Sequence, residues 1–190
     1  MEPSATSHLI AAPMDLPATE IDDFDAVVRL YWPRIFRFTL ASVRDRDAAQ
    51  SLTQDCFVRA YRGREHFRGD CGVQTWLMQI AVNLVRDFAR NRRLQFWRQA
   101  PVVDPDHASD WIPDRDLSPE ARALVKERLA AVWSATASLS GRQRTVFLLR
   151  FVEDMALLEI AAATGMKVGT VKGHLFRALQ AVRERLGSVE

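Results

Sequence analysis

Hydrophobic and polar residues follow a helical period of three to four positions from Phe24 to the end of the chain. The alternation of two that marks a β-strand is nearly absent. Ser140 with Gln143 three positions later is the pattern of a capping box, which opens a helix. The predicted helices cover residues 25–43, 47–62, 73–97, 141–152, 156–163 and 168–186. We therefore expect an all-α protein.

Proline and aspartate interrupt this pattern once, over residues 99–117, which hold three prolines and five aspartates. Ser118 followed by Pro119 then restarts a helix, with serine as the N-cap and proline at the first helical position. The sequence predicts two small helical domains, residues 24–98 and 118–187, joined by a flexible linker. An acidic, weakly structured arm, residues 1–23, precedes them.

The stretch EIAAATGMKVGTVKGHLFRAL, residues 159–179, has the composition of a helix-turn-helix. Ala161 is small enough for close helix packing, and Gly165 supplies the left-handed turn position. Apolar side chains then recur on one face of the second helix: Val171, Leu175, Ala178 and Val182. Lys172, Gly173, Phe176 and Arg177 point away from that face. We expect Gly169 and Thr170 to lie in the first turn of a recognition helix whose N-terminal end enters a major groove.

A second polar face follows the helix predicted over residues 73–97. Its positions recur at spacings of four and three and carry two amides followed by three guanidiniums: Gln79, Asn83, Arg86, Arg90 and Arg93. Leu77, Ala81, Leu84 and Phe88 form the opposite, core-facing stripe. Guanidiniums hold phosphates, amides pair with base edges, and Trp76 on the flank offers a surface for unstacked bases. This pattern favours a single-stranded nucleic-acid face over the alternative, which is a solvated arginine face with a buried Trp76.

Composition agrees with a globular nucleic-acid-binding protein. Lys and Arg number 26 and Asp and Glu 24, giving a net charge of only +2, but the charges lie in blocks. We expect a cytoplasmic protein, because no secretory signal, membrane-length apolar run or CxxC pair is visible and the two cysteines, Cys56 and Cys71, suit a reducing compartment.

Enzymatic chemistry has no support in the motifs. The four histidines are scattered, and no HExxH, GxSxG or phosphate-loop pattern occurs. Cys56, His66 and Cys71 fit no common metal spacing, so a core Cys56 and a loop Cys71 are expected. We expect no catalytic residue, no metal and no cofactor.

Three stretches together resemble the extracytoplasmic-function (ECF) group of bacterial sigma factors. They are QSLTQDCFVRAYR (residues 50–62), HFRGDCGVQTWLMQIAVNLVRDFARNRR (66–93) and GTVKGHLFRAL (169–179). The resemblance implies a first domain that binds core RNA polymerase and melts the promoter −10 element, and a second domain that binds the −35 element. The chemistry would belong to the polymerase.

The resemblance also implies roles for individual residues. The loop over residues 67–73 would capture a flipped base, and the −10 strand would meet Arg68, Asp70, Cys71, Trp76, Gln79, Asn83, Arg86, Arg90 and Arg93. The −35 element would meet Thr170, Lys172, Gly173, Phe176 and Arg177. The β′ clamp of the polymerase would contact Leu52, Gln54, Asp55 and Phe57, and the β flap would contact the second domain. An anti-sigma partner linked to the membrane is also implied.

This chain departs from the family pattern in three places. Gln50-Ser51 replaces an acidic pair, residues 71–74 differ in the base-capturing loop, and Gly173-His174 replaces a Ser-Arg pair, which makes −35 contacts sensitive to pH through His174. Two other functions are consistent with the same residues. A helix-turn-helix regulator that does not replace the sigma subunit would share the last helices, and a helical adaptor would not bind DNA at all.

Overall fold

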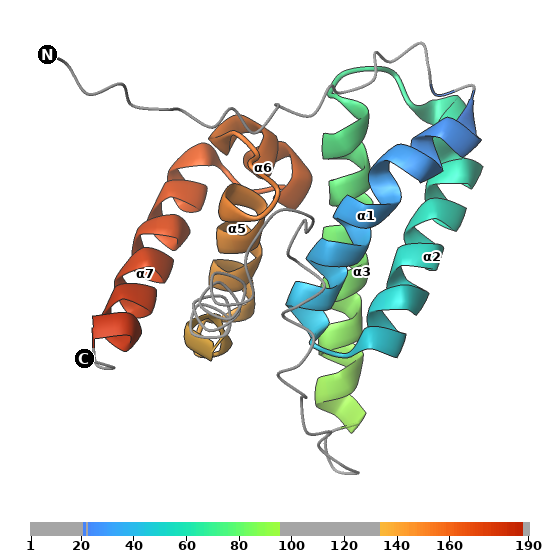
Figure 1. Cartoon of the computed structure of the whole chain (residues 1–190). Coiled ribbons are helices and arrows are strands. Elements are labelled where there is room, and N and C mark those ends of the chain that lie inside the picture. Colours follow the sequence, from blue (N-terminus) through green and yellow to red (C-terminus); the bar gives the residue numbers. More distant parts are fainter. Residues whose placement is uncertain (1–20, 22, 96–133, 188–190) are drawn as a thin grey trace, which may run out of the picture.

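The computed structural model describes residue 21 and residues 23–95 and 134–187 of the chain, and all its regular elements there are helices. The first domain contains α1 (Phe24–Val43), α2 (Arg46–Gly63), a short 3-10 turn η2 (Arg64–His66) and α3 (Val73–Gln95). The second contains α5 (Gly141–Phe151), α6 (Leu157–Thr164) and α7 (Val168–Gly187) (Figure 1). The all-α prediction is confirmed. The linker, the helix start at Ser118 and all of the arm except residues 21 and 23 lie outside the described residues.

Local side-chain chemistry explains where several helices begin. Asp23 and Asp45 each accept a 3.0 Å hydrogen bond from a backbone N–H in the first turn of α1 and α2. Ser140 and Gln143 form the predicted capping box of α5 in both directions. Asp23 therefore belongs to α1, although we expected the acidic arm to extend through this position.

The first domain packs three helices around one apolar core. The face of α1 that carries Val27, Tyr31, Ile35 and Phe38 is buried. These residues join Cys56 and Ala60 of α2 and Leu77 and Ala81 of α3 in one cluster. Inside it, the hydroxyls of Thr39 and Thr53 lie 3.0 Å apart and hydrogen-bond each other. A continuous apolar core thus holds the helices together, and these two buried hydroxyls have hydrogen-bond partners within it.

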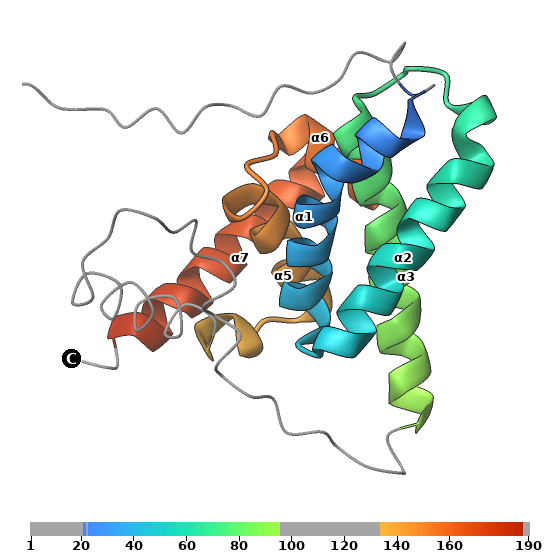
Figure 2. The same ribbon diagram turned by 45° about the vertical axis from the view of Figure 1, so that its right-hand side comes forward.

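The two domains pack directly against each other. α6 lies against α3, and α5 lies against α1, so that α1 occupies the middle of the molecule (Figure 2). Met78 and Val82 of α3 belong to the same buried cluster as Met155 and Ile160 of the second domain. Near the ends of α1 and α5, Arg144 donates to the carbonyl of Ser42 at 3.4 Å. The structure is therefore a closed arrangement of the two domains.

Candidate nucleic-acid interfaces

The turn between α6 and α7 has the geometry of a helix-turn-helix. Gly165 caps α6 with φ of 69°, the left-handed region that glycine enters without a steric penalty. Ile160 and Val171, on either side of the turn, are fully buried, and Ala161, Met166 and Leu175 pack against the same cluster. The glycine turn and the apolar contacts predicted for this motif are confirmed.

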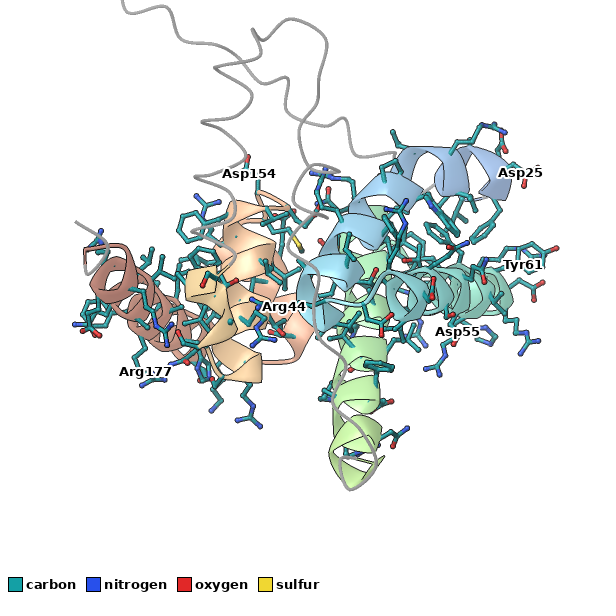
Figure 3. The ribbon with its side chains drawn as sticks, turned by 60° about the horizontal axis from the view of Figure 1, so that its bottom comes forward. Asp25, Arg44, Asp55, Tyr61, Asp154 and Arg177 are labelled. Carbon is teal, nitrogen blue, oxygen red and sulfur yellow. The ribbon has the colours of Figure 1, made fainter. Side chains whose placement is uncertain are left out.

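The recognition helix α7 has one buried and one exposed face. Val171, Ala178 and Val182 are buried, with Leu175 partly buried between them. Thr170, Lys172, Phe176 and Arg177 are exposed and Gly173 is partly buried on the other side. Figure 3 shows Arg177 extending away from the protein. The ring of Phe176 is 63% exposed and suits an apolar contact with a thymine methyl group.

His174 lies beside the exposed cationic face of α7. Its Nδ1 is 3.5 Å from the guanidinium of Arg177. Partial burial, and then the charges of Arg177 and Arg142, lower the pKa of His174 below its ordinary value. The imidazole is therefore neutral at pH 7, and the positive charge of this face comes from the lysine and arginine side chains.

The polar stripe of α3 is open to solvent over the part that the structure describes. Gln79, Arg86 and Arg90 are exposed and Asn83 is partly buried, whereas Leu77, Ala81 and Leu84 of the opposite stripe are buried. Arg90 forms a 3.3 Å surface ion pair with Asp87, which leaves most of its guanidinium available for phosphate. The side chain of Arg93 lies outside the described residues.

The loop before α3 is shaped by an aromatic pair that the sequence analysis did not single out. The rings of Phe67 and Trp76 lie 4.9 Å apart at an angle of 38°. Gly69 has φ of 73°, which turns the chain between exposed Arg68 and Asp70, and Cys71 is partly buried. The aromatic pair anchors the loop at the start of the polar stripe.

The four residues of the predicted polymerase contact on α2 differ in exposure: two are buried and two are exposed. Leu52 and Phe57 lie in the core, so their side chains support the helix from within. Gln54 and Asp55 are exposed, and next to them are Val58 (48% exposed) and Tyr61 (49% exposed). Figure 3 shows Asp55 and Tyr61 at the opposite end of the molecule from Arg177. The sequence analysis missed Val58 and Tyr61, although large apolar residues at i and i+3 on a polar helix face could have indicated them.

A third face of α3 also escaped the sequence analysis. Gln74, Met78, Val82 and Val85 recur at spacings of four, four and three and are all at least nine-tenths buried. This stripe lies between the core stripe and the polar stripe on the helical wheel, on the side where Gln74 contacts the second domain. Its signal was the excess of apolar residues in α3, which is more than one core-facing stripe requires.

No site for metal or membrane chemistry appears in residues 21, 23–95 and 134–187. No group of three or more potential metal ligands comes together within them. Within the same residues, no helix has the length and apolar character needed to cross a bilayer. Burial raises the pKa of the Cys56 thiol to about 12, so this cysteine is an inert core residue.

Two family models match this chain, one for each domain. The Sigma-70 region 2 model matches residues 27–95, which include all of the polar stripe of α3. The Sigma-70, region 4 model matches residues 129–182, which include the helix-turn-helix.

Curated relatives match across both domains. The RNA polymerase sigma-H factor of Pseudomonas aeruginosa is 32% identical over 170 residues, covering 86% of this chain and 86% of the relative. The ECF RNA polymerase sigma-E factor of Escherichia coli K12 is 31% identical over 137 residues, covering 71% and 72%.

Among solved structures, the fold is similar to that of the sigma factor RpoE of Bartonella quintana, crystallised with the anti-sigma factor NepR. The TM-score is 0.68 at 21% identity, over 87% of this chain and 98% of that chain.

Proposed function

Because this chain belongs to the ECF sigma factors of the sigma-70 family, we propose that its two DNA-facing surfaces divide promoter recognition between them. The chain is a transcription initiation factor that directs RNA polymerase to promoters and is not itself an enzyme. In this proposal, the polar stripe of α3 binds the −10 element and the exposed face of α7 binds the −35 element.

The exposed stripe of α3 is the observation that carries this proposal. A helix-turn-helix alone also fits a regulator that leaves the sigma subunit in place. Such a regulator has no use for a second helix with amides and guanidiniums on one solvent face, next to an aromatic-anchored loop. Those groups suit a displaced strand, because amides pair with base edges and guanidiniums hold the backbone.

Within the −10 surface, Gln79, Asn83, Arg86 and Arg90 contact the displaced strand. The loop residues Arg68, Asp70 and Cys71 select the flipped base of this strand, and Trp76 supports the loop. Within the −35 surface, Lys172 and Arg177 supply charge at the groove, and Phe176 supplies the apolar contact.

The polymerase-binding surface is the exposed side of α2. Gln54 and Asp55 contribute hydrogen-bonding groups, and Val58 and Tyr61 contribute apolar area. This surface lies far from Arg177, so binding polymerase leaves the recognition helix free for DNA (Figure 3). The chain would act in the cytoplasm, where bacterial RNA polymerase works.

Transcription with purified components tests this function. Core RNA polymerase with and without the chain is given a library of randomised promoters, and the transcripts are sequenced. We expect initiation from templates that share two short boxes only when the chain is present. If the chain binds DNA but core polymerase starts no transcript with it, the regulator interpretation takes its place.

An anti-sigma partner would control this activity by covering the polymerase- and promoter-binding surfaces. The alternative is self-inhibition, in which the acidic arm covers the arginine-rich stripe as a DNA mimic. Deleting residues 1–20 separates the two and keeps buried Ile21 and Asp23, the N-cap of α1. A strong rise in transcription from the truncated chain, with no partner present, would favour self-inhibition.

A further inference from the structure

A buried carboxylate joins the two domains. Glu153 lies in the loop between α5 and α6, and its side chain has no exposed surface. In α1, the Nε of Arg37 donates to one oxygen of this carboxylate and a terminal nitrogen of Arg37 donates to the other, both at 3.0 Å. Arg34, one helical turn earlier, brings its Nε to 3.4 Å. Each of these guanidiniums comes from the other domain.

The backbone of Glu153 belongs to the same network. Its carbonyl oxygen accepts hydrogen bonds from Arg34 at 3.2 Å and from the side-chain amide of Gln74 in α3 at 3.4 Å. Arg34 also donates to the side-chain oxygen of Gln74. One loop residue of the second domain is thereby bound to two helices of the first.

This network is selective for a single docking position. A carboxylate removed from water is unfavourable unless charged donors meet it. Domain positions that bury Glu153 without both arginines would leave its charge without donors, whereas separating the domains returns the carboxylate to water.

The closed arrangement cannot contact both promoter boxes at once. A compact chain of this length has a radius of gyration of about 16 Å. Boxes two helical turns apart lie roughly 70 Å from each other. The two domains must therefore separate before each reaches its own box.

We propose that Glu153, Arg34, Arg37 and Gln74 form a latch that holds the free chain closed and opens when the chain binds polymerase. The latch is a property of the chain alone. Its opening on polymerase rests on the proposed function. Because a protein held in an incompetent state binds with a reduced apparent affinity, releasing the latch should tighten binding to core polymerase.

Energy transfer between one dye on each domain measures the closed fraction. Gln50 in α2 and Gln180 in α7 are both exposed and accept cysteine for labelling, with Cys71→Ser removing the accessible natural thiol and buried Cys56 retained. The variants are Glu153→Ala, Arg37→Ala and the two combined. Arg37 is one-third exposed, so its loss does not threaten the folding of the first domain.

Asp154→Asn is the matched control. It removes a carboxylate from the adjacent position, but Asp154 is 83% exposed and pairs with Arg150 of its own domain. Its φ of 51° is one that asparagine tolerates.

We expect the original chain and the control to give high transfer in the absence of polymerase. Each single variant should raise the ratio of open to closed chains about tenfold, the equivalent of one charge-assisted hydrogen bond. The double variant should open little further than the more open single variant, because both changes remove the same pair.

Unchanged transfer in both Glu153→Ala and Arg37→Ala would overturn the latch, as would an original chain that is already open. Core-polymerase affinity is then measured on the unlabelled chains. An opened variant that binds polymerase no more tightly would overturn the link to polymerase while leaving transcription activity, and so the proposed function, intact.

Discussion

The side chain of Glu159 accepts a 2.6 Å hydrogen bond from the backbone N–H of Ala156, at the start of α6. This is one half of a capping box. The other half is missing, because the alanine methyl group has no oxygen to accept from the first turn of the helix. The backbone of Ala156 nevertheless has the extended conformation of an N-cap, with φ of −70° and ψ of 156°.

Replacing Ala156 by serine should therefore stabilise the helix-turn-helix. Serine would complete the box without a change of backbone, and the exposed position leaves room for the hydroxyl. We expect the free energy of unfolding to rise by about 1 kcal/mol, measured by chemical denaturation. Ala162→Ser, an exposed position inside the same helix, is the control and should be slightly destabilising. Equal effects of the two changes would argue against the capping explanation.

Lys172→Ala and Arg177→Ala should each weaken binding to −35 DNA and leave binding to core polymerase unchanged. Both side chains are exposed on α7, and Arg177 lies at the opposite end of the molecule from Asp55 of α2 (Figure 3). We expect a loss of about 1–3 kcal/mol in each case, measured by fluorescence anisotropy with duplex DNA at fixed salt. Arg185→Ala removes an exposed charge two helical turns beyond Arg177, away from the N-terminal end of α7, and should have little effect. Full promoter occupancy by the first two variants would refute the assignment of this face.

Asn83→Ala should impair promoter opening more than formation of the closed promoter complex. Asn83 lies partly buried between exposed Gln79 and Arg86, where a displaced strand can reach its amide. Permanganate footprinting on duplex and on pre-melted promoters measures the two stages separately, and pre-melting should largely rescue the variant. Asn91→Ala, an exposed asparagine off the stripe, is the control. An equal defect on both templates would instead indicate lost docking or misfolding.

The sequence was sufficient for several features that depend on neighbouring residues. Ser140 and Gln143 act across one helical turn, and Gly165 adopts a left-handed φ that no distant contact is needed to explain. The core and polar stripes of α3 and the two faces of α7 follow from helical period alone. These local signals predict the two exposed faces that are the candidate DNA surfaces.

Contacts between distant segments were beyond the sequence. Nothing local indicates that Glu153 meets Arg37, which lies 116 positions earlier in the chain. Tertiary packing also decides which residues of the predicted polymerase contact are exposed. The motif contains Leu52, Gln54, Asp55 and Phe57, but it does not state that Leu52 and Phe57 face the core. The closed arrangement of the domains could not be predicted either. A linker sequence limits the distance between two domains but does not determine how they pack against each other.

The affinity of the chain for −35 DNA should depend on pH through His174. Partial burial and the cations Arg177 and Arg142 lower the pKa of His174 below its ordinary 6.5 in the folded chain. The folded chain therefore binds fewer protons here than the unfolded chain does, so this residue's contribution to stability is complete above pH 6.5 and is lost as pH falls through the lowered pKa. Phosphate has the opposite influence, because a nearby anion favours the imidazolium. Binding of −35 DNA should accordingly take up a proton, and its affinity should rise as pH falls from 7 toward 5.5. Anisotropy titrations across this range, at constant ionic strength, would show a steeper pH dependence for the original chain than for His174→Gln, while Lys172→Ala should retain the dependence at lower affinity. Identical pH profiles for the original chain and His174→Gln would place the imidazole outside the DNA contact.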